Sequence, residues 1–194
     1  MTGAVVHKLE ADGRPFRAVV MDDGSGRLNP PSAAVYGEPS DGCPVRIHSR
    51  CVYGEIFEST NCDCRWQLQE SLRIIREHGS GVLVYLDQEG RGAGLLVKAQ
   101  GYKLSQEEGL DTFASYAALG FKADSRDYSA AADLLKELGL GAVRLLTNNP
   151  DKLAALGAVG IKAEMCQLVQ PEPSGETLKY LAAKSVHGHV IRSA

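Results

Sequence analysis

The chain has 194 residues, of which 44% are hydrophobic and 23% are charged, and its formal net charge is −3. These values are ordinary for a globular protein, and the length suits one domain with a substantial core. The weak negative charge argues against a nucleic-acid partner, so an anionic ligand requires a local basic cluster. The N-terminus lacks the apolar core of a signal peptide, and no apolar run approaches the roughly 20 residues of a membrane span. We therefore expect a cytoplasmic protein that binds neither membranes nor nucleic acid.

The first part of the chain is rich in short β-forming runs. Residues 16–21, 33–38 and 45–49 are dominated by β-branched, aromatic and small apolar side chains, which predicts strands. The segments DDGSG (22–26) and LNPPS (28–32) are typical of the turns and loops between strands. We expect this N-terminal portion to form antiparallel β-structure.

Helical and strand patterns alternate from Trp66 onward. The expected helices cover 66–79, 95–107, 111–118, 128–140, 150–160 and 174–188, and the expected strands cover 81–87, 142–148 and 163–169. The run GVLVYLD at 81–87 is almost continuously apolar, as expected for a strand that is covered on both faces. The alternation predicts a single α/β domain over 1–194, in which a β-rich part (1–44) precedes an α/β core (45–190).

Three of the five cysteines, Cys51, Cys62 and Cys64, lie close together with the spacing C-x10-C-x-C. In a reducing compartment such clusters are more often metal ligands or reactive groups than disulfides, and buried thiols without a ligand are the alternative. A closed structural zinc site takes four ligands, and His48, three residues before Cys51, is a candidate for the fourth. Three protein ligands plus a water are the pattern of a catalytic zinc. The cysteine count therefore favours a catalytic metal site.

Two polar loops follow buried strands. The glycines of DQEGRGAGLL (87–96) would allow backbone N–H groups to approach an anion, although a tight turn explains them equally well. In LLTNNPDKL (145–153), the polar residues before Pro150 are either ligand contacts or caps of the next helix. Open α/β sheets bind ligands at the carboxyl ends of their strands, so both loops are candidate binding sites.

Five motifs, RIHSRC, CDCRWQL, YLDQEGRGAGL, LGFKADSRDY and RLLTNNPDK, occur in this order between about Arg46 and His189. With them the chain resembles the GTP cyclohydrolase II family, which opens riboflavin biosynthesis. The resemblance implies a three-layer α/β/α domain with a mixed sheet that works as a homodimer. It also implies hydrolysis of GTP to 2,5-diamino-6-ribosylamino-pyrimidinone 5'-phosphate, with release of formate and pyrophosphate.

In enzymes that this chain resembles, one zinc per chain is held by the residues that match the three cysteines. Such a metal lowers the pKa of its bound water from about 15.7 toward about 7, which supplies a nucleophile for C8 of guanine. Tyr102 matches the family tyrosine beside the imidazole ring, where a phenol suits proton transfer or hydrogen bonding. An ordinary amphipathic-helix position is the alternative for this tyrosine.

The resemblance also assigns roles within ADSRD (123–127). Asp124 is implied as a general base, and Arg126 as a nucleophile that attacks the α-phosphorus and expels pyrophosphate. A guanidinium is a poor nucleophile, whereas a bidentate grip on phosphate is ordinary chemistry for arginine. We therefore favour Arg126 as a phosphate clamp. The alternative is that Ser125 or Asp127 caps the next helix and that Arg126 faces solvent.

The remaining matches are to substrate contacts. These positions are Arg46, Ile47, His48, Ser49, Arg50, Gln67, Glu89, Gly90, Arg91, Thr112, Thr147 and Lys152. A carboxylate in the loop 89–91 is suited to accept hydrogen bonds from guanine N1–H and the 2-amino group. Lys152 is suited to a phosphate. A triphosphate also implies Mg²⁺, which binds mainly to the phosphates and to few protein ligands.

The chain departs from the family pattern near the predicted zinc ligands. Arg50 stands where an acidic residue is usual, Asn61 where arginine is usual, and Arg65 where glycine is usual. One residue is inserted between Tyr102 and Thr112, and PEPSGE replaces an asparagine-rich segment before the last helix. Two interpretations of these changes remain open. The charges at positions 50 and 61 have changed together and compensate each other, or the pocket accepts another nucleotide.

Two alternatives to plain GTP cyclohydrolase II follow. One is a paralogous enzyme of specialised metabolism that uses a different guanine nucleotide or stops at a formylated intermediate. The other is a non-catalytic, zinc-containing protein that binds guanine nucleotides. The retention of Tyr102, Asp124 and Arg126 argues against mere binding, because binding alone needs no such set of groups.

Overall fold

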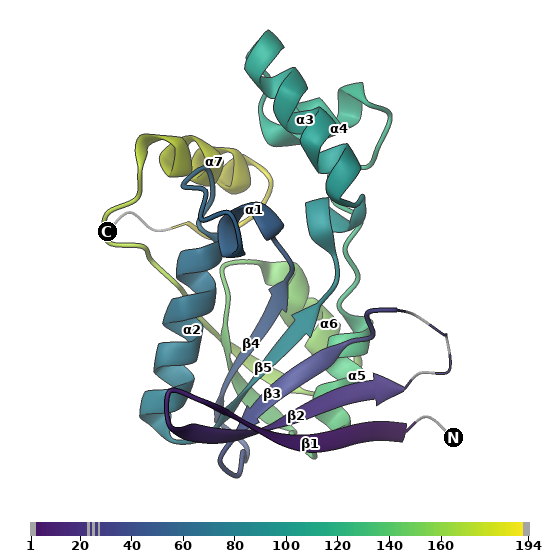
Figure 1. Ribbon diagram of the computed structural model, residues 1–194, viewed down its shortest axis with the longest axis vertical. Helices are drawn as coiled ribbons and strands as arrows, with labels where there is room; N and C mark the ends of the chain where they lie inside the picture. The colour runs from purple at the N-terminus through teal and green to yellow at the C-terminus, as the bar shows by residue number, and fades with distance from the viewer. Residues whose placement is uncertain (1–2, 23, 25, 27, 192–194) are drawn as a thin grey trace. The chain divides into compact units, whose positions relative to one another are not determined.

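The computed structural model describes residues 3–22, 24, 26 and 28–191 (Figure 1). The chain divides into two compact units. The first comprises residues 1–48, 68–87 and 128–168, and the second comprises 49–67, 88–127 and 169–194. The chain is α/β, as expected from the alternation of its patterns, whereas a single domain over 1–194 stays a prediction.

A mixed sheet forms the centre of the first unit. Its strands are β1 (Gly3–Ala11), β2 (Arg14–Asp22), β3 (Ser32–Tyr36), β4 (Pro44–Ser49), β5 (Gly81–Leu86), β6 (Ala142–Leu146) and β7 (Lys162–Cys166). Within the described residues the strand order is β1-β2-β3-β5-β4-β6-β7. The pairs β1–β2, β2–β3 and β3–β5 are antiparallel, whereas β4–β6 and β6–β7 are parallel. The expected antiparallel N-terminal portion is therefore confirmed.

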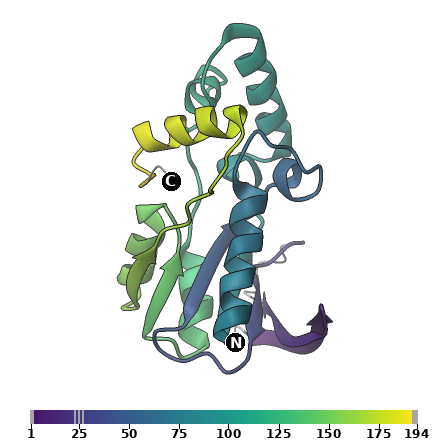
Figure 2. The ribbon, with the colours of Figure 1, turned by 90° about the vertical axis from the view of Figure 1, so that its left-hand side faces the viewer.

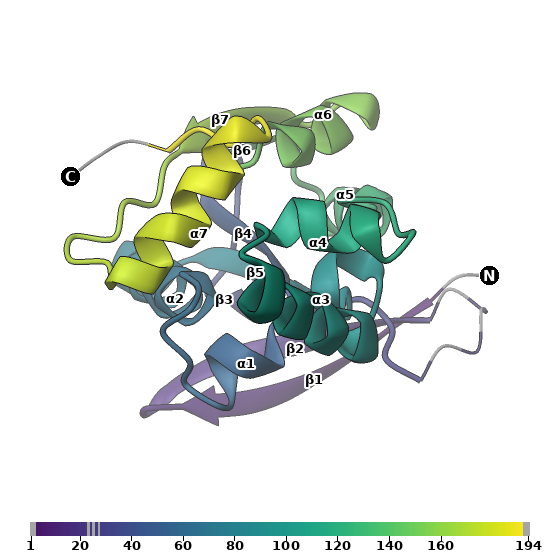
Figure 3. The ribbon, with the colours of Figure 1, turned by 90° about the horizontal axis from the view of Figure 1, so that it is seen from above.

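Helices cover both faces of this sheet. Residues 68–78 of α2 (Cys64–His78) lie on one face, and α5 (Ser129–Glu137) and α6 (Pro150–Ala158) lie on the other (Figures 2 and 3). The side chains of Ile47, Leu134 and Leu145 in the core are completely buried. In α6, proline occupies the first turn and the Asn149 side chain accepts a hydrogen bond from the backbone N–H of Asp151 at 2.9 Å. The predicted three-layer arrangement is thus present in the first unit.

The second unit consists of helices and loops. It contains α1 (Val52–Glu55), the start of α2, a 3₁₀ turn η1 (Glu89–Gly92), α3 (Leu95–Glu108), α4 (Thr112–Ala118) and α7 (Gly175–Val186). Asp111 is the N-cap of α4, and its carboxylate accepts a hydrogen bond from the backbone N–H of Ala114 at 2.8 Å. Helix α3 ends at Gly109, which takes the left-handed conformation that glycine adopts most readily.

The predicted strands and helices are confirmed with small shifts at their ends. Strand β1 was not predicted because its sequence, GAVVHKLEA, lacks clean alternation and nearly all of it is exposed. The short α1 and η1 were also missed, since neither is long enough to show a period. The predicted turn at 22–26 includes Asp23 and Ser25, which lie outside the described residues. Among the helices in the described ranges, none is both long and apolar enough to cross a membrane.

Candidate active site

Cys51, Cys62 and Cys64 form a compact group of thiols in the second unit. Their sulfur atoms lie within 4.8 Å of one another, and the sulfurs of Cys51 and Cys62 are 3.8 Å apart. All three cysteines are free thiols in this structure, and the absence of a disulfide among them stays a prediction. Among the described residues, these three cysteines are the group whose side chains could hold a metal ion together. His48 is not part of that group.

Local backbone structure brings these sulfurs together. Cys51 is the N-cap of α1, where its sulfur accepts a hydrogen bond from the backbone N–H of Gly54 at 3.4 Å, and Cys64 is the first residue of α2. A Cβ atom on Gly54 would lie 3.1 Å from the Cys62 sulfur and 3.4 Å from the Cys51 sulfur. These distances are tighter than ordinary contact. Glycine at position 54 therefore keeps open the space beside the thiols.

A buried cation lies beside the cluster. The Lys98 ammonium is 3.2 Å from the Cys51 sulfur, 2.7 Å from a Glu89 oxygen and 4.5 Å from the centre of the Tyr53 ring. Burial alone would lower the pKa of Lys98, but the Cys51 thiolate and Glu89 raise the pKa by more than burial lowers it. The side chain therefore stays charged. Hydrogen bonds from the other two thiols lower the pKa of Cys51. The cluster thus holds negative charge on sulfur and a cation that balances part of it.

This donor set fits a zinc ion. Thiolates are soft ligands that Zn²⁺ accepts readily, and a set of three protein ligands leaves one position open for water or substrate. The space that Gly54 leaves beside the sulfurs fits the same interpretation. The group is therefore compatible with the predicted zinc site.

The thiols line a small cavity of about 60 Å³ in the second unit. The predicted site residues that also line it are Ser49, Arg50, Glu89, Gly90, Arg91, Tyr102, Thr112 and Arg126. A larger cavity of about 430 Å³ shares Tyr102 and Thr112 with it and extends along α3 and α7. Burial raises the pKa of Tyr102, so its phenol keeps its proton at neutral pH. The second unit thus brings most of the predicted chemistry around one space.

The Glu89–Gly90–Arg91 turn contributes a carboxylate that is already engaged. One Glu89 oxygen accepts from the backbone N–H of Val52 at 2.7 Å, and the other accepts from Lys98 and from the backbone N–H of Gly90. Gly90 takes a φ of 58°, and a Cβ there would lie 3.1 Å from the Cβ of Lys98. In this structure the carboxylate therefore orients Lys98 toward Cys51, and its contact with guanine stays a prediction.

Arg91 is the most unusual side chain in this cavity. It takes a φ of 55° and is only 8% exposed, and its guanidinium carbon lies 3.6 Å from the centre of the Phe113 ring. Both terminal nitrogens are buried and have no hydrogen-bond partner among the described residues. Buried donors without acceptors are costly and rare in folded proteins. The guanidinium is therefore set up to bind an acceptor from outside the chain.

Asp124 and Arg126 form an ion pair. The Arg126 Nε donates to the two Asp124 oxygens at 2.9 and 3.1 Å, and its backbone N–H donates at 3.0 Å. Burial raises the pKa of Asp124, but the hydrogen bonds and charge of Arg126 lower it by more. Asp124 is therefore ionised and holds the guanidinium in place, which is compatible with Arg126 as a phosphate clamp.

A sequence model of the family described as GTP cyclohydrolase II matches residues 4–166 of the chain. The chain belongs to the GTP cyclohydrolase II family. The resemblance inferred from the five motifs is thus confirmed. The expectation that the protein is an enzyme of this family is also confirmed.

Relatives with curated names agree with this assignment. GTP cyclohydrolase-2 of Azotobacter vinelandii is 43% identical over 176 residues, which cover 89% of this chain and 83% of that protein. GTP cyclohydrolase-2 of Actinobacillus succinogenes is 50% identical over 131 residues, covering 66% of this chain and 60% of that protein. Riboflavin biosynthesis protein RibBA of Bacillus mycoides is 48% identical over 162 residues, which cover 82% of this chain but only 41% of that protein. The chain thus spans less than half the length of the RibBA relative.

The first unit carries five of the other predicted substrate contacts, namely Arg46, Ile47, His48, Thr147 and Lys152. Lys152 donates to the carbonyl of Ile47 at 2.8 Å, and Arg46 donates to the carbonyl of Leu146 at 2.8 Å and to a ring nitrogen of His48 at 3.4 Å. Thr147 accepts from the backbone N–H of Asn149 at 3.0 Å. The loop 145–153 follows the carboxyl end of β6, as expected from the sequence. The roles of the five residues toward a nucleotide stay predictions.

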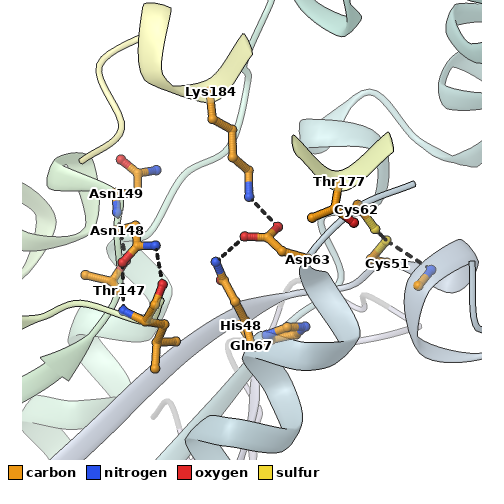
Figure 4. A network of polar contacts seen from close by, with 12 residues as sticks. His48, Cys51, Cys62, Asp63, Gln67, Thr147, Asn148, Asn149, Thr177 and Lys184 are labelled. Atoms are coloured by element: carbon orange, nitrogen blue, oxygen red, sulfur yellow. Dashed lines mark hydrogen bonds and ion pairs between the residues drawn. The ribbon is translucent and has the colours of Figure 1, made fainter. Parts of the chain in front are cut away.

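Asn148, beside them, has a purely structural set of bonds. Its amide donates to the carbonyl of Leu168 at 2.7 Å and accepts from the backbone N–H of the same residue at 2.9 Å (Figure 4). Asn149 caps α6. The capping alternative is therefore correct for Asn149.

The departures from the family pattern fall in different places. Arg50 lines the small cavity, and Asn61 lines the larger one. Arg65, in the first turn of α2, instead pairs with Glu58 of the preceding loop at 2.7 Å. The Asn61 side chain accepts from the Ser59 hydroxyl at 2.8 Å. Two of the three substitutions near the predicted zinc ligands thus line the cavities, while the third forms an ion pair between α2 and the loop before it.

Sequence reasoning missed several residues around the thiols, above all Gly54, Asp63, Lys98 and Lys184. Asp63 stands between two predicted ligands, and that position was the one available sign of its involvement. Lys98 and Lys184 lie on helices, where a lysine is by default a solvent-exposed charge. Gln67 is buried and donates to Asp63 at 2.5 Å. Its predicted contact with the nucleotide is not tested by this geometry.

Proposed function

We propose that this chain hydrolyses the imidazole ring of GTP in riboflavin biosynthesis, with zinc at its three cysteines. The products are formate, pyrophosphate and 2,5-diamino-6-ribosylamino-pyrimidinone 5'-phosphate. The observation that carries the proposal is the shared cavity. It is lined both by three clustered thiols and by Arg91, whose buried terminal nitrogens have no acceptor in the described part of the chain. A metal site and a vacant donor pair in one cavity suit a substrate that combines a heterocycle with phosphates.

Cys51, Cys62 and Cys64 would hold the zinc, which supplies activated water for hydrolysis at C8 of guanine. Lys98 offsets part of the negative charge on the thiolates, and Glu89 keeps it in place. Tyr102 holds a proton on its phenol oxygen in the same cavity, which suits it to donate a hydrogen bond beside the ring. Arg91 provides two N–H groups for a carbonyl or phosphate oxygen of the nucleotide.

Arg126 serves the phosphate end in this proposal. Asp124 orients its guanidinium, which then binds and stabilises the phosphate from which pyrophosphate leaves. Attack by Arg126 on phosphorus would require the guanidinium to lose a proton, and the adjacent carboxylate opposes that loss. Mg²⁺ would accompany the triphosphate, with Lys152 and Thr147 of the first unit as further predicted contacts. A cytoplasmic homodimer is the expected working form.

The test is to assay formate and pyrophosphate separately after incubation of the protein with GTP, Zn²⁺ and Mg²⁺. Release of both products, with loss of formate release on zinc chelation, is the expected result. Pyrophosphate alone would indicate an enzyme that stops at a formylated intermediate. Neither product, together with tight GTP binding, would replace the proposal with a nucleotide-binding protein.

A paralogue that uses a different guanine nucleotide is the second candidate, and Arg50 is the observation that favours it. This residue lines the cavity at a position that is usually acidic in the family. A guanidinium there changes the potential that a phosphate or a developing oxyanion meets. Comparison of kcat/KM for GTP, GDP and 2'-deoxy-GTP separates the two candidates, because plain GTP cyclohydrolase II requires GTP to be preferred.

A further inference from the structure

The turn that carries Cys62 and Cys64 also carries a buried carboxylate. The Asp63 side chain is 3% exposed, and its two oxygens accept from the Lys184 ammonium at 2.7 Å and from the Gln67 amide at 2.5 Å (Figure 4). Lys184 is itself buried, and its nitrogen lies 4.5 Å from the centre of the Tyr180 ring. Buried charges persist in proteins when they are paired and hydrogen-bonded. Asp63 and Lys184 form such a pair.

Helix α7 contacts the same loop at a second point. The carbonyl of Thr60 accepts from the hydroxyl of Ser174 at 2.8 Å and from that of Thr177 at 2.7 Å. Ser174 is also the N-cap of α7 and accepts from the backbone N–H of Thr177 at 3.1 Å. The start of α7 is therefore bonded to Thr60 and its last turn to Asp63, so the helix holds both sides of Cys62.

We propose that α7 positions the loop that carries Cys62 and Cys64 so that these thiols can bind the metal, and that Lys184 is the positioning residue. This inference rests on the proposed zinc site. Three thiolates and one Zn²⁺ carry a net charge of −1, so a neighbouring unpaired carboxylate would be repelled or would compete as a ligand. Lys184 neutralises Asp63 and fixes the direction of its side chain. Because Asp63 is the residue between Cys62 and Cys64, a displacement of its backbone moves both sulfurs.

A purely structural role for the pair makes a different prediction. If Lys184 merely anchors α7, its loss lowers the stability of the protein but leaves the metal affinity of the folded protein unchanged. If Lys184 positions the thiols, the affinity itself falls. Metal affinity is therefore the readout that separates the two roles.

The experiment compares wild type with Lys184→Met, Lys184→Arg and, as a control, Lys103→Met. Lys103 is an exposed lysine on α3 that pairs only with Glu107, at 3.8 Å, in the described structure. Zinc affinity is measured by competition with a chelator, and Co²⁺ replacement reports the thiolate-to-metal absorption. We expect Lys184→Met to weaken zinc binding by about 10–100-fold, the usual range for partners of metal ligands. Lys184→Arg, which keeps the cation, should stay much closer to wild type, and the control should not change.

The double variant Asp63→Asn/Lys184→Met covers the case in which Lys184→Met fails to fold, because it leaves no buried charge unpaired. We expect it to bind zinc at least about threefold more weakly than wild type, since α7 no longer holds residue 63. Wild-type zinc affinity and an unchanged cobalt spectrum in folded Lys184→Met, or in the folded double variant, would overturn the inference alone. Failure of the wild-type protein itself to bind zinc would instead overturn the zinc site on which the inference rests.

Discussion

The two units handle buried polar groups in opposite ways. In the first unit, Lys152, Arg46 and Asn148 bond to backbone carbonyls of the sheet and its loops, so these groups stabilise the fold. In the second unit, charged side chains pair with one another around three thiols, and two Arg91 donors have no acceptor among the described residues. The difference indicates that the second unit has been shaped for a ligand, because uncompensated donors cost stability that binding restores.

The variant with the largest expected effect tests whether the thiols of the second unit are required for hydrolysis of the guanine ring. Cys62→Ser should abolish formate release, since it removes one of three thiolates from the metal. Pyrophosphate release should survive in part, because Arg126 and Mg²⁺ act on the phosphates. Separate assays of the two products measure this, with Cys166→Ser on β7 as the matched control. Equal loss of both products in a folded Cys62→Ser protein would show that the two steps are inseparable.

The charge balance beside the thiols is the next test. Lys98→Met removes the cation that contacts Cys51 and leaves Glu89 with only its two backbone N–H donors among the contacts described above. We expect zinc affinity and kcat for formate release to fall by about 10–100-fold. The exposed Lys103→Met on the same helix should behave as wild type. If Lys98→Met changes only the midpoint of thermal unfolding, the lysine stabilises the fold without acting on the metal site.

Arg50 sharpens the comparison within the second unit. Arg50→Glu restores the usual family residue in the cavity, and we expect kcat/KM for GTP relative to GDP to change by about tenfold, or about 1.4 kcal/mol. Arg65→Gly also restores a family residue, but that side chain pairs with Glu58, so its effect should be much smaller. Unchanged ratios for Arg50→Glu on every nucleotide would favour plain GTP cyclohydrolase II.

The smallest effect is expected in the first unit. Lys152→Met leaves the Ile47 carbonyl without its donor, which should lower the free energy of unfolding by about 1–3 kcal/mol. If Lys152 also contacts a phosphate, as predicted, the same variant should raise KM for GTP by about threefold to tenfold. Chemical denaturation and steady-state kinetics measure the two effects. A stability loss without any change in KM would assign Lys152 to the fold alone.

Much of the fold was predictable because it depends on local patterns. The strand at 81–87 and the helix at 150–158 follow from an apolar run and from a proline–asparagine start, which are read within a few residues. The thiol site was predictable for a similar reason, since Cys62 and Cys64 are near neighbours and Cys51 is close in the chain. Strand β1 escaped prediction because pairing with β2, and not its own pattern, makes it a strand.

The sequence by itself determined the family, the α/β class and the clustering of the three cysteines, because motifs and short spacings can be read directly from the order of the residues. Only the tertiary structure decided which charges surround those cysteines. Lys98 contacts Cys51 from 47 positions away, and Lys184 contacts Asp63 from 121 positions away. Such contacts depend on how helices pack. Residue types and local periods do not encode which distant side chains share a buried space. That sharing determines which lysines pair with buried carboxylates, and it leaves the terminal nitrogens of Arg91 without an acceptor among the described residues.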